Sequence, residues 1–219
     1  MSDPIRFYFD FISPYAYVAW SSVQPLARAA GRELVPVPVL FAGLLRAHET
    51  KGPAEVPAKK VYVFKDAYRK AHKAGLGPLV PPPSHPFNPL VALRVAGLPM
   101  ESDARLRLIT ALYRATWSGG GGIEGEARVT EIASAAGLDG AELVRRAAEP
   151  EAKERLRLAT DEAISRGVFG VPTAAVSGEL FWGVDSLEHL ADFVQGRDPL
   201  PADLTAAWTH LPATSIRRT

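Results

Sequence analysis

The chain has 219 residues and no cysteine. This absence excludes disulfide bonds, zinc sites with thiolate ligands, iron–sulfur clusters and every cysteine nucleophile. The chain also lacks an excess of charge of either sign, because 25 Lys and Arg residues are balanced by 24 Asp and Glu residues. A formal net charge of +1 produces no field that would attract a phosphate backbone, so we expect no nucleic-acid partner.

Long apolar runs are absent as well. No window contains the ~20 consecutive apolar residues of a membrane span, and the first six residues lack the basic and apolar regions of a signal peptide. We therefore expect a soluble, cytoplasmic protein with no membrane partner. The five histidines show neither His-x-x-x-His nor His-Glu-x-x-His spacing, so no metal site is predicted. No Gly-x-Ser-x-Gly elbow is present, which counts against a serine hydrolase.

The first 40 residues predict a strand, a helix and a second strand. Residues 5–11 are mostly β-branched and aromatic, as is typical of a strand buried on both faces. Ser13-Pro14 then supplies a preferred helix N-cap and a favoured first helical residue, and apolar side chains follow at helical spacing up to Gly31. Residues 33–40 predict a strand near a sheet edge, because its two prolines cannot donate to a ladder. The opening is therefore a parallel strand–helix–strand unit.

The remainder of the chain is helical first and then returns to strands. Residues 57–167 have an almost wholly helical pattern that is broken by Gly and Pro clusters, with Ser102 as the expected cap of one helix. Residues 172–177 and 180–182 predict a hairpin, and a capping box, Asp185-x-x-Glu188, opens a last helix.

This order predicts an α/β fold with a thioredoxin-like sheet and a large all-helical insert. We assign a discontinuous thioredoxin-like domain to residues 1–45 and 165–196, and the insert to residues 46–164. Residues 197–219 are expected to be an extended tail with at most one helical turn.

Ser13 has two interpretations. The dipeptide Ser13-Pro14 alone favours an ordinary N-cap. The alternative is that the hydroxyl and the free amide groups face a cleft beyond the strand, where open α/β sheets bind ligands. A helix N-terminus favours an anion such as a thiolate, and a hydroxyl can donate a hydrogen bond to it.

Two later positions also have a simple and a functional interpretation. Val171-Pro172 is either a turn that begins a strand or a cis peptide bond, which would leave the Val171 N–H and C=O unpaired for an extended peptide-like ligand. Asp185 is most simply an N-cap, and the functional alternative is that its carboxylate accepts from a ligand ammonium group.

Residues of the helical insert carry weaker signals. Lys59, Asn88 and Arg94 would ordinarily be exposed polar side chains on helices. Trp117 ends an apolar stripe, for which packing in the core is the better-supported interpretation.

Several short motifs occur together and in a fixed order. They are FDFISPY at residues 9–15, Lys59-x-x-Tyr62-x-x-x-Asp66-x-x-Arg69, Pro86-Phe87-Asn88, Trp117, GVFGVPT at residues 167–173, and Phe181-Trp182-Gly183-x-Asp185. In this combination the chain, over about residues 5–195, resembles the 2-hydroxychromene-2-carboxylate isomerases. That family is related to kappa-class glutathione transferases and shares the DsbA-like thioredoxin fold with a helical insert.

The resemblance implies a cofactor, a reaction and a set of roles. It implies a homodimer that uses glutathione to isomerise 2-hydroxychromene-2-carboxylate or a similar small aromatic carboxylate between cis and trans forms. Ser13 would be the catalytic residue and hold the thiol, and the rest of glutathione would lie on Val171, Pro172, Asp185 and Ser186. The substrate would contact Lys59, Asn88 and Arg94 through its carboxylate and Trp117 through its ring.

One position departs from the family pattern. The family usually has arginine after the aspartate of the Gly-x-Asp motif, whereas this chain has Ser186. The missing guanidinium would weaken the grip on a glutathione carboxylate. A kappa-like glutathione transferase, which would leave a stable conjugate, and a non-catalytic binding protein of the same fold therefore stay open as alternatives.

Overall fold

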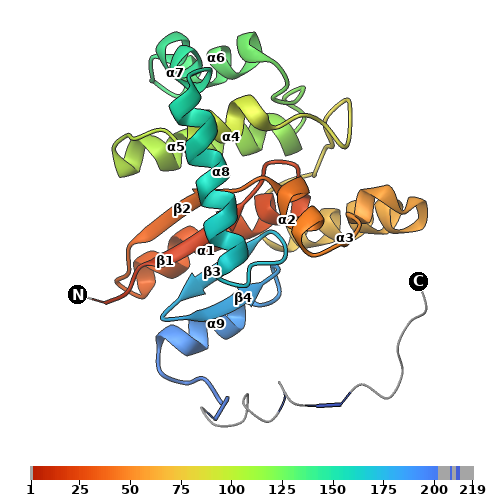
Figure 1. Ribbon diagram of the computed structural model, residues 1–219. Helices are drawn as coiled ribbons and strands as arrows, with labels where there is room; N and C mark the ends of the chain where they lie inside the picture. Colours follow the sequence, from red (N-terminus) through yellow and green to blue (C-terminus); the bar gives the residue numbers. More distant parts are fainter. Residues whose placement is uncertain (1, 202–207, 209–210, 213–219) are drawn as a thin grey trace.

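The computed structural model describes residues 2–201, 208 and 211–212 (Figure 1). The predicted tail from residue 197 falls largely outside them. A four-stranded sheet lies at the centre, in the order β2-β1-β3-β4. β1 runs parallel to β2 and antiparallel to β3, and β3 pairs with β4 as a hairpin. The strands are β1 Ile5–Phe9, β2 Leu34–Pro38, β3 Thr173–Val176 and β4 Glu179–Trp182.

The four predicted strands are confirmed, although β1 ends at Phe9 instead of residue 11 and β2 ends at Pro38 instead of residue 40. β2 is an edge strand, as its prolines required. The hairpin turn is Ser177-Gly178, and both residues have positive φ angles, 52° and 90°. A two-residue turn with positive φ at both residues has a backbone twist that matches the right-handed twist of the flanking strands.

Helices cover both faces of the sheet. α1 (Pro14–Ala29) lies against one face with Phe7 and Phe9 of β1, and it also packs on α3 (Pro57–Lys73), α5 (Ser102–Trp117) and α9 (Leu187–Val194). α8 (Pro150–Ser165) crosses the opposite face, at the front of Figure 1, and contacts α2 (Phe41–Ala47). Tyr8 of β1 is buried on this second side. β1 is therefore buried on both faces, as predicted.

The predicted helical middle is also confirmed, with local corrections. Its further helices are α4 (Leu90–Ala96), α6 (Glu126–Ala135) and α7 (Gly140–Ala147). The sequence patterns missed α2 and the short 3-10 helix Pro53–Glu55. Ser102 is not the cap of α5, because the helix already includes it and Glu101 occupies the N-cap position. In the described residues, no helix is both long and apolar enough to cross a membrane.

An aromatic cluster fills the space between β1, α1 and α5. Tyr113 packs against Phe9, Phe11, Tyr17 and Trp20, with ring centroids 4.9 to 6.2 Å apart. The Tyr113 side chain is fully buried, and its hydroxyl has no hydrogen-bond partner among the described residues. The Tyr17 hydroxyl, by contrast, is 2.8 Å from Ser118 Oγ.

This contrast gives the first prediction. Replacing Tyr113 with phenylalanine should raise the free energy of unfolding by about 1 kcal/mol, because it removes a buried polar group that has no partner. Tyr17→Phe is the matched control and should lower the free energy of unfolding by about 1 kcal/mol, because a hydrogen bond is lost. Urea denaturation of both variants and the wild type measures the difference. A loss of stability in Tyr113→Phe would contradict the prediction.

Candidate functional site

Ser13 lies at the junction of β1 and α1 and is 8% exposed. Its Oγ accepts from the Ala16 N–H at 3.2 Å, so the N-cap interpretation is confirmed. The same hydroxyl donates to the Val171 carbonyl at 3.4 Å, across 158 residues of sequence. Ser13 therefore both caps α1 and faces the segment that leads into β3.

The Val171–Pro172 peptide bond is cis, which is the second of the two interpretations that the sequence left open. The expectation that the Val171 carbonyl is unpaired is wrong, because it accepts the Ser13 hydroxyl. The Val171 N–H has no hydrogen-bond partner among the described residues. The next carbonyl, of Pro172, accepts from the Gly183 N–H at 2.9 Å and joins this segment to the end of β4. One backbone donor at Val171 is thus left for a ligand.

Asp185 does not cap the last helix. Ser186 occupies the N-cap position of α9, and its Oγ donates to the Trp182 carbonyl instead of to the helix. Asp185 is exposed, and its carboxylate makes no hydrogen bond among the described residues. The simpler of the two sequence interpretations is therefore wrong, and the carboxylate is left available to a ligand.

A polar network joins the start of α1 to α3. The Tyr15 hydroxyl donates to Asp66 Oδ2 at 2.8 Å, and Lys70 Nζ lies 2.7 Å from the same oxygen. Burial alone raises the pKa of Asp66, but the hydrogen bonds from Lys70 and Tyr15 lower it overall. Burial, together with the charges of Asp66 and Asp185, raises the pKa of Tyr15. Of these four side chains, sequence reasoning assigned only Asp185 a role.

The buried carboxylate of Asp10 holds the loop before Ser13. Asp10 is 1% exposed, and its two oxygens accept from the Ile12 N–H at 3.0 Å and the Phe41 N–H at 2.9 Å. The second bond attaches the start of α2 to this loop. Burial raises the pKa of Asp10 to about 6, although the backbone hydrogen bonds act in the opposite direction. Asp10 is in the FDFISPY motif, but the sequence analysis gave it no role.

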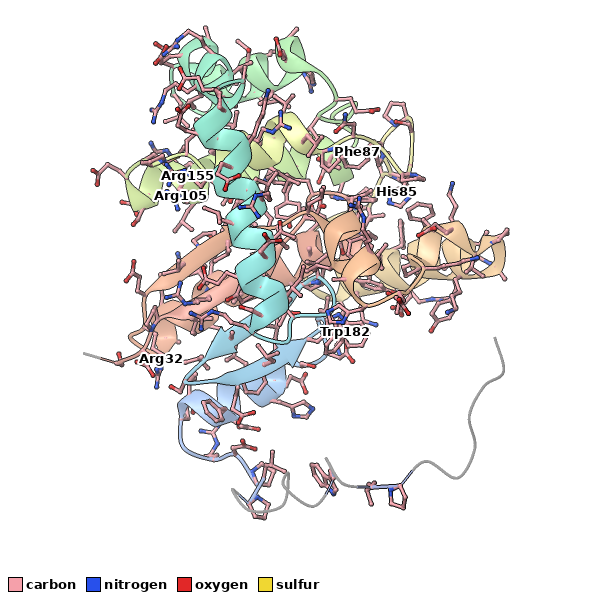
Figure 2. The ribbon with its side chains drawn as sticks, in the orientation of Figure 1. Arg32, His85, Phe87, Arg105, Arg155 and Trp182 are labelled. Carbon is pink, nitrogen blue, oxygen red and sulfur yellow. The ribbon has the colours of Figure 1, made fainter. Side chains whose placement is uncertain are left out.

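Two side chains of the insert support the same loop. Trp117 is fully buried and donates through Nε1 to the Phe11 carbonyl at 2.9 Å. His85 Nε2 lies 3.0 Å from the Ile12 carbonyl, and since a carbonyl only accepts, the ring donates. His85 and Phe87 lie in the segment between α3 and α4 (Figure 2). The Trp117 ring has no exposed surface in this structure, so the core interpretation agrees with it.

The three residues expected to hold a substrate carboxylate share no hydrogen bond. Lys59 is exposed in the first turn of α3, whereas the neighbouring Lys60 donates to the His85 carbonyl at 2.8 Å. Asn88 is exposed, and its Oδ1 accepts from the Leu90 N–H at the start of α4. Arg94 lies on α4 with a buried Nε that has no partner among the described residues. Their common role stays a prediction.

Trp182 and Phe169 form an exposed aromatic pair beside the Val171 segment. Their ring centroids are 5.1 Å apart, and Trp182 is labelled in Figure 2 at the end of β4. A Cβ on Gly170 would lie 2.7 Å from Trp182 Nε1, so a larger residue there would displace the tryptophan ring.

No group of residues that could bind a metal ion occurs in the described part of the chain.

Comparison with known proteins agrees with the fold described above. Residues 4–195 match the family model of the DSBA-like thioredoxin domain. The chain is 31% identical, over 89% of its length and 99% of the relative's, to 2-hydroxychromene-2-carboxylate isomerase of Sphingobium xenophagum. It is 27% identical to glutathione S-transferase kappa 1 of Caenorhabditis elegans, over 90% and 93% of the two chains. A solved 2-hydroxychromene-2-carboxylate isomerase superimposes with a TM-score of 0.80 at 26% identity, covering 93% of this chain and 98% of the other.

The buried carboxylate of Asp10 gives the second prediction. Its pKa is about 6 in the folded chain, above the ordinary value of 3.8, so the folded state binds the proton more tightly. Stability should therefore fall as the pH rises from about 4 to about 6, by about 3 kcal/mol from this group alone, and stay at the lower value above pH 6. In Asp10→Asn this part of the pH dependence should disappear.

Urea denaturation at several pH values between 4 and 7 tests this prediction. Asp103→Asn, which changes an exposed carboxylate, is the control and should keep the wild-type slope. Equal slopes for Asp10→Asn and the wild type would contradict the assignment.

Proposed function

Since the chain belongs to the family of DsbA-like thioredoxin domains, we propose that it is a glutathione-dependent cis-trans isomerase of 2-hydroxychromene-2-carboxylate or a similar aromatic-degradation intermediate. One observation carries the proposal. The Ser13 hydroxyl caps α1 and faces Val171 beside a cis proline, in a chain without any cysteine of its own. Sulfur chemistry at this position then needs a bound thiol.

The start of α1 suits a thiolate. α1 has 16 residues and no acidic side chain in its first turn, so its positive end is not neutralised locally. The Tyr15 N–H has no partner among the described residues. As a donor, the Ser13 hydroxyl makes a long bond of 3.4 Å to the Val171 carbonyl, which it can exchange for a bond to sulfur. Both donors would favour the thiolate over the thiol and lower the pKa of bound glutathione.

The remainder of glutathione would lie along the Val171 segment. The free Val171 N–H would pair with the cysteinyl carbonyl, next to Pro172, as though a strand were added. The exposed Asp185 carboxylate would accept from the γ-glutamyl ammonium group, with Ser186 beside it. This position for the cofactor uses the Val171 N–H and the Asp185 carboxylate, neither of which has a hydrogen-bond partner among the described residues.

The reaction would proceed by reversible addition. Bound glutathione would supply a thiolate that adds reversibly to the activated double bond, so that the bond can rotate with no net oxidation or proton transfer. Lys59, Asn88 and Arg94 are the proposed ligands of the substrate carboxylate.

The alternatives are a kappa-like glutathione transferase and a non-catalytic binding protein. Similarity to the kappa transferases favours the first, and Ser186 in place of the family arginine favours the second. Product analysis distinguishes an isomer from a conjugate, and calorimetric titration with glutathione detects binding. We also propose a cytoplasmic homodimer, in keeping with the family resemblance.

Ser13 provides the third prediction. Ser13→Ala should lower kcat/KM for the isomerisation by about 100-fold, because one donor to the thiolate is lost. It should also raise the pKa of bound glutathione, followed through the ultraviolet absorbance of the thiolate. Ser21→Ala is the control, since the Ser21 hydroxyl bonds to the Val18 carbonyl within the same helix. Turnover that is equal with and without glutathione, in the wild type and in Ser13→Ala, would exclude the mechanism.

Asp185 and Ser186 provide the fourth prediction. Ser186→Arg should bind glutathione about fivefold more tightly, because a guanidinium is added beside a glutathione carboxylate. Asp185→Asn should weaken binding by about tenfold, because an ionic acceptor becomes neutral. Isothermal titration calorimetry measures both. If neither substitution changes the affinity, the γ-glutamyl end lies elsewhere.

A further inference from the structure

The peptide group between Ile12 and Ser13 is held at both ends. Its carbonyl accepts from His85 Nε2 at 3.0 Å, and its N–H donates to the Asp10 carbonyl at 3.2 Å. Rotation of this planar group changes the φ angle of Ser13, which is −92°, and turns the Ser13 side chain with it. The hydrogen bond from His85 therefore acts on the direction in which the Ser13 hydroxyl points.

The His85 ring lies among three aromatic side chains. Its centroid is 5.1 Å from that of Phe64, 5.7 Å from that of Trp117 and 6.3 Å from that of Phe87. Phe87 lies beside it in the segment between α3 and α4 (Figure 2). Packing thus holds the ring in the orientation in which Nε2 meets the Ile12 carbonyl.

The backbone around His85 is fixed as well. Lys60 Nζ donates to the His85 carbonyl at 2.8 Å. On either side of His85, Glu124 accepts from Ser84 Oγ at 2.6 Å and from the Asn88 N–H at 3.1 Å. The segment that carries the ring is therefore attached to α3 through Lys60 and to the stretch between α5 and α6 through Glu124. The helical insert presents the imidazole at a fixed place.

Packing alone does not account for a histidine at this position. Burial lowers the pKa of His85, and so does the charge of Lys60, although the bond to Ile12 acts in the opposite direction. A neutral imidazole carries one proton, and because Nε2 donates to Ile12, Nδ1 is left as a buried acceptor without a partner among the described residues. An unpaired buried acceptor lowers stability. A phenylalanine would pack in the same place without that cost, so the donor to Ile12 is what histidine adds here.

We propose that His85 is a positioning residue for Ser13. By holding the Ile12 carbonyl it fixes the direction of the Ser13 hydroxyl, and with it the hydrogen bond that this hydroxyl donates to a bound thiolate. The inference rests on the glutathione-dependent isomerisation proposed above, and it gives a residue of the insert a part in that reaction through Ser13.

A variant that keeps the ring and removes the donor tests the proposal. In His85→Phe, kcat/KM should fall about tenfold, with the change in kcat and not in KM, because the Ser13 hydroxyl is less well directed. For the same reason the pKa of bound glutathione should rise by about 1. The free energy of unfolding should stay near that of the wild type, because the lost hydrogen bond is offset by removal of the unpaired Nδ1.

Two amide variants separate the donor from the shape of the ring. In His85→Gln the side-chain nitrogen can reach the place of the imidazole Nε2 and donate, so most of kcat and the wild-type thiol pKa should return. The shorter amide of His85→Asn cannot reach it, so this variant should behave like His85→Phe. His72→Gln changes an exposed histidine of α3 and is the control. Steady-state kinetics, thiolate absorbance against pH and urea denaturation are measured for each variant.

Three results would overturn the proposal. They are wild-type kcat and thiol pKa in His85→Phe, equal behaviour of His85→Gln and His85→Asn, and a loss of activity that follows stability while the thiol pKa stays unchanged. If the wild type binds no glutathione, the isomerisation itself is excluded and this role falls with it. Wild-type turnover that does not respond to His85 would exclude the role alone.

Discussion

The hydrogen bonds that hold the loop between β1 and α1 determine where Ser13 lies. Asp10 lies in the loop and accepts hydrogen bonds from two backbone amides. Trp117 donates to the Phe11 carbonyl, and His85 donates to the Ile12 carbonyl. These anchors come from the loop itself, from α5 and from the segment between α3 and α4. The thioredoxin-like sheet and the helical insert therefore act on one short loop, and neither part alone would fix it.

The cost of this arrangement is a carboxylate buried in the core. Asp10 keeps its two amide partners but loses the solvation that an acid has in water, which is why its pKa rises. The nearby Tyr113 hydroxyl is buried too, and no described residue accepts its proton. The region behind Ser13 is thus less stable than an all-apolar packing would be, as is common where a structure positions reactive groups.

Local patterns were sufficient to predict much of the fold. Consecutive aromatic and β-branched residues specify β1, two prolines place β2 at an edge, and Ser13-Pro14 begins α1. Each of these signals acts within a few residues of chain. α2 escaped prediction because its start is stabilised by Asp10, which is 31 residues away in sequence.

The site was harder to predict because its contacts are distant in sequence. Tyr15 and Asp66 are separated by 51 residues, and Phe11 and Trp117 by 106, so no spacing rule joins them. For Asp185, by contrast, a local sequence pattern was present and gave a wrong prediction. A capping box was a sound local expectation, but Ser186 takes the N-cap position and bonds to Trp182 instead. Local rules fail here because tertiary packing sets where α9 begins.

Ala16 distinguishes this chain from redox proteins of the same fold. The thioredoxin-like redox motif is Cys-x-x-Cys, a frame of four residues. If that frame is placed at the start of α1, Ser13 stands at its first position and Ala16, which donates its amide to the Ser13 hydroxyl, stands at its fourth. The Ala16 side chain is fully buried. A cysteine at position 13 would therefore have no resolving thiol in the frame, and a second sulfur at position 16 would have to fit where only a methyl group is packed. A cysteine at position 13 alone would therefore be limited to mixed disulfides with other thiols, because the frame holds no second sulfur.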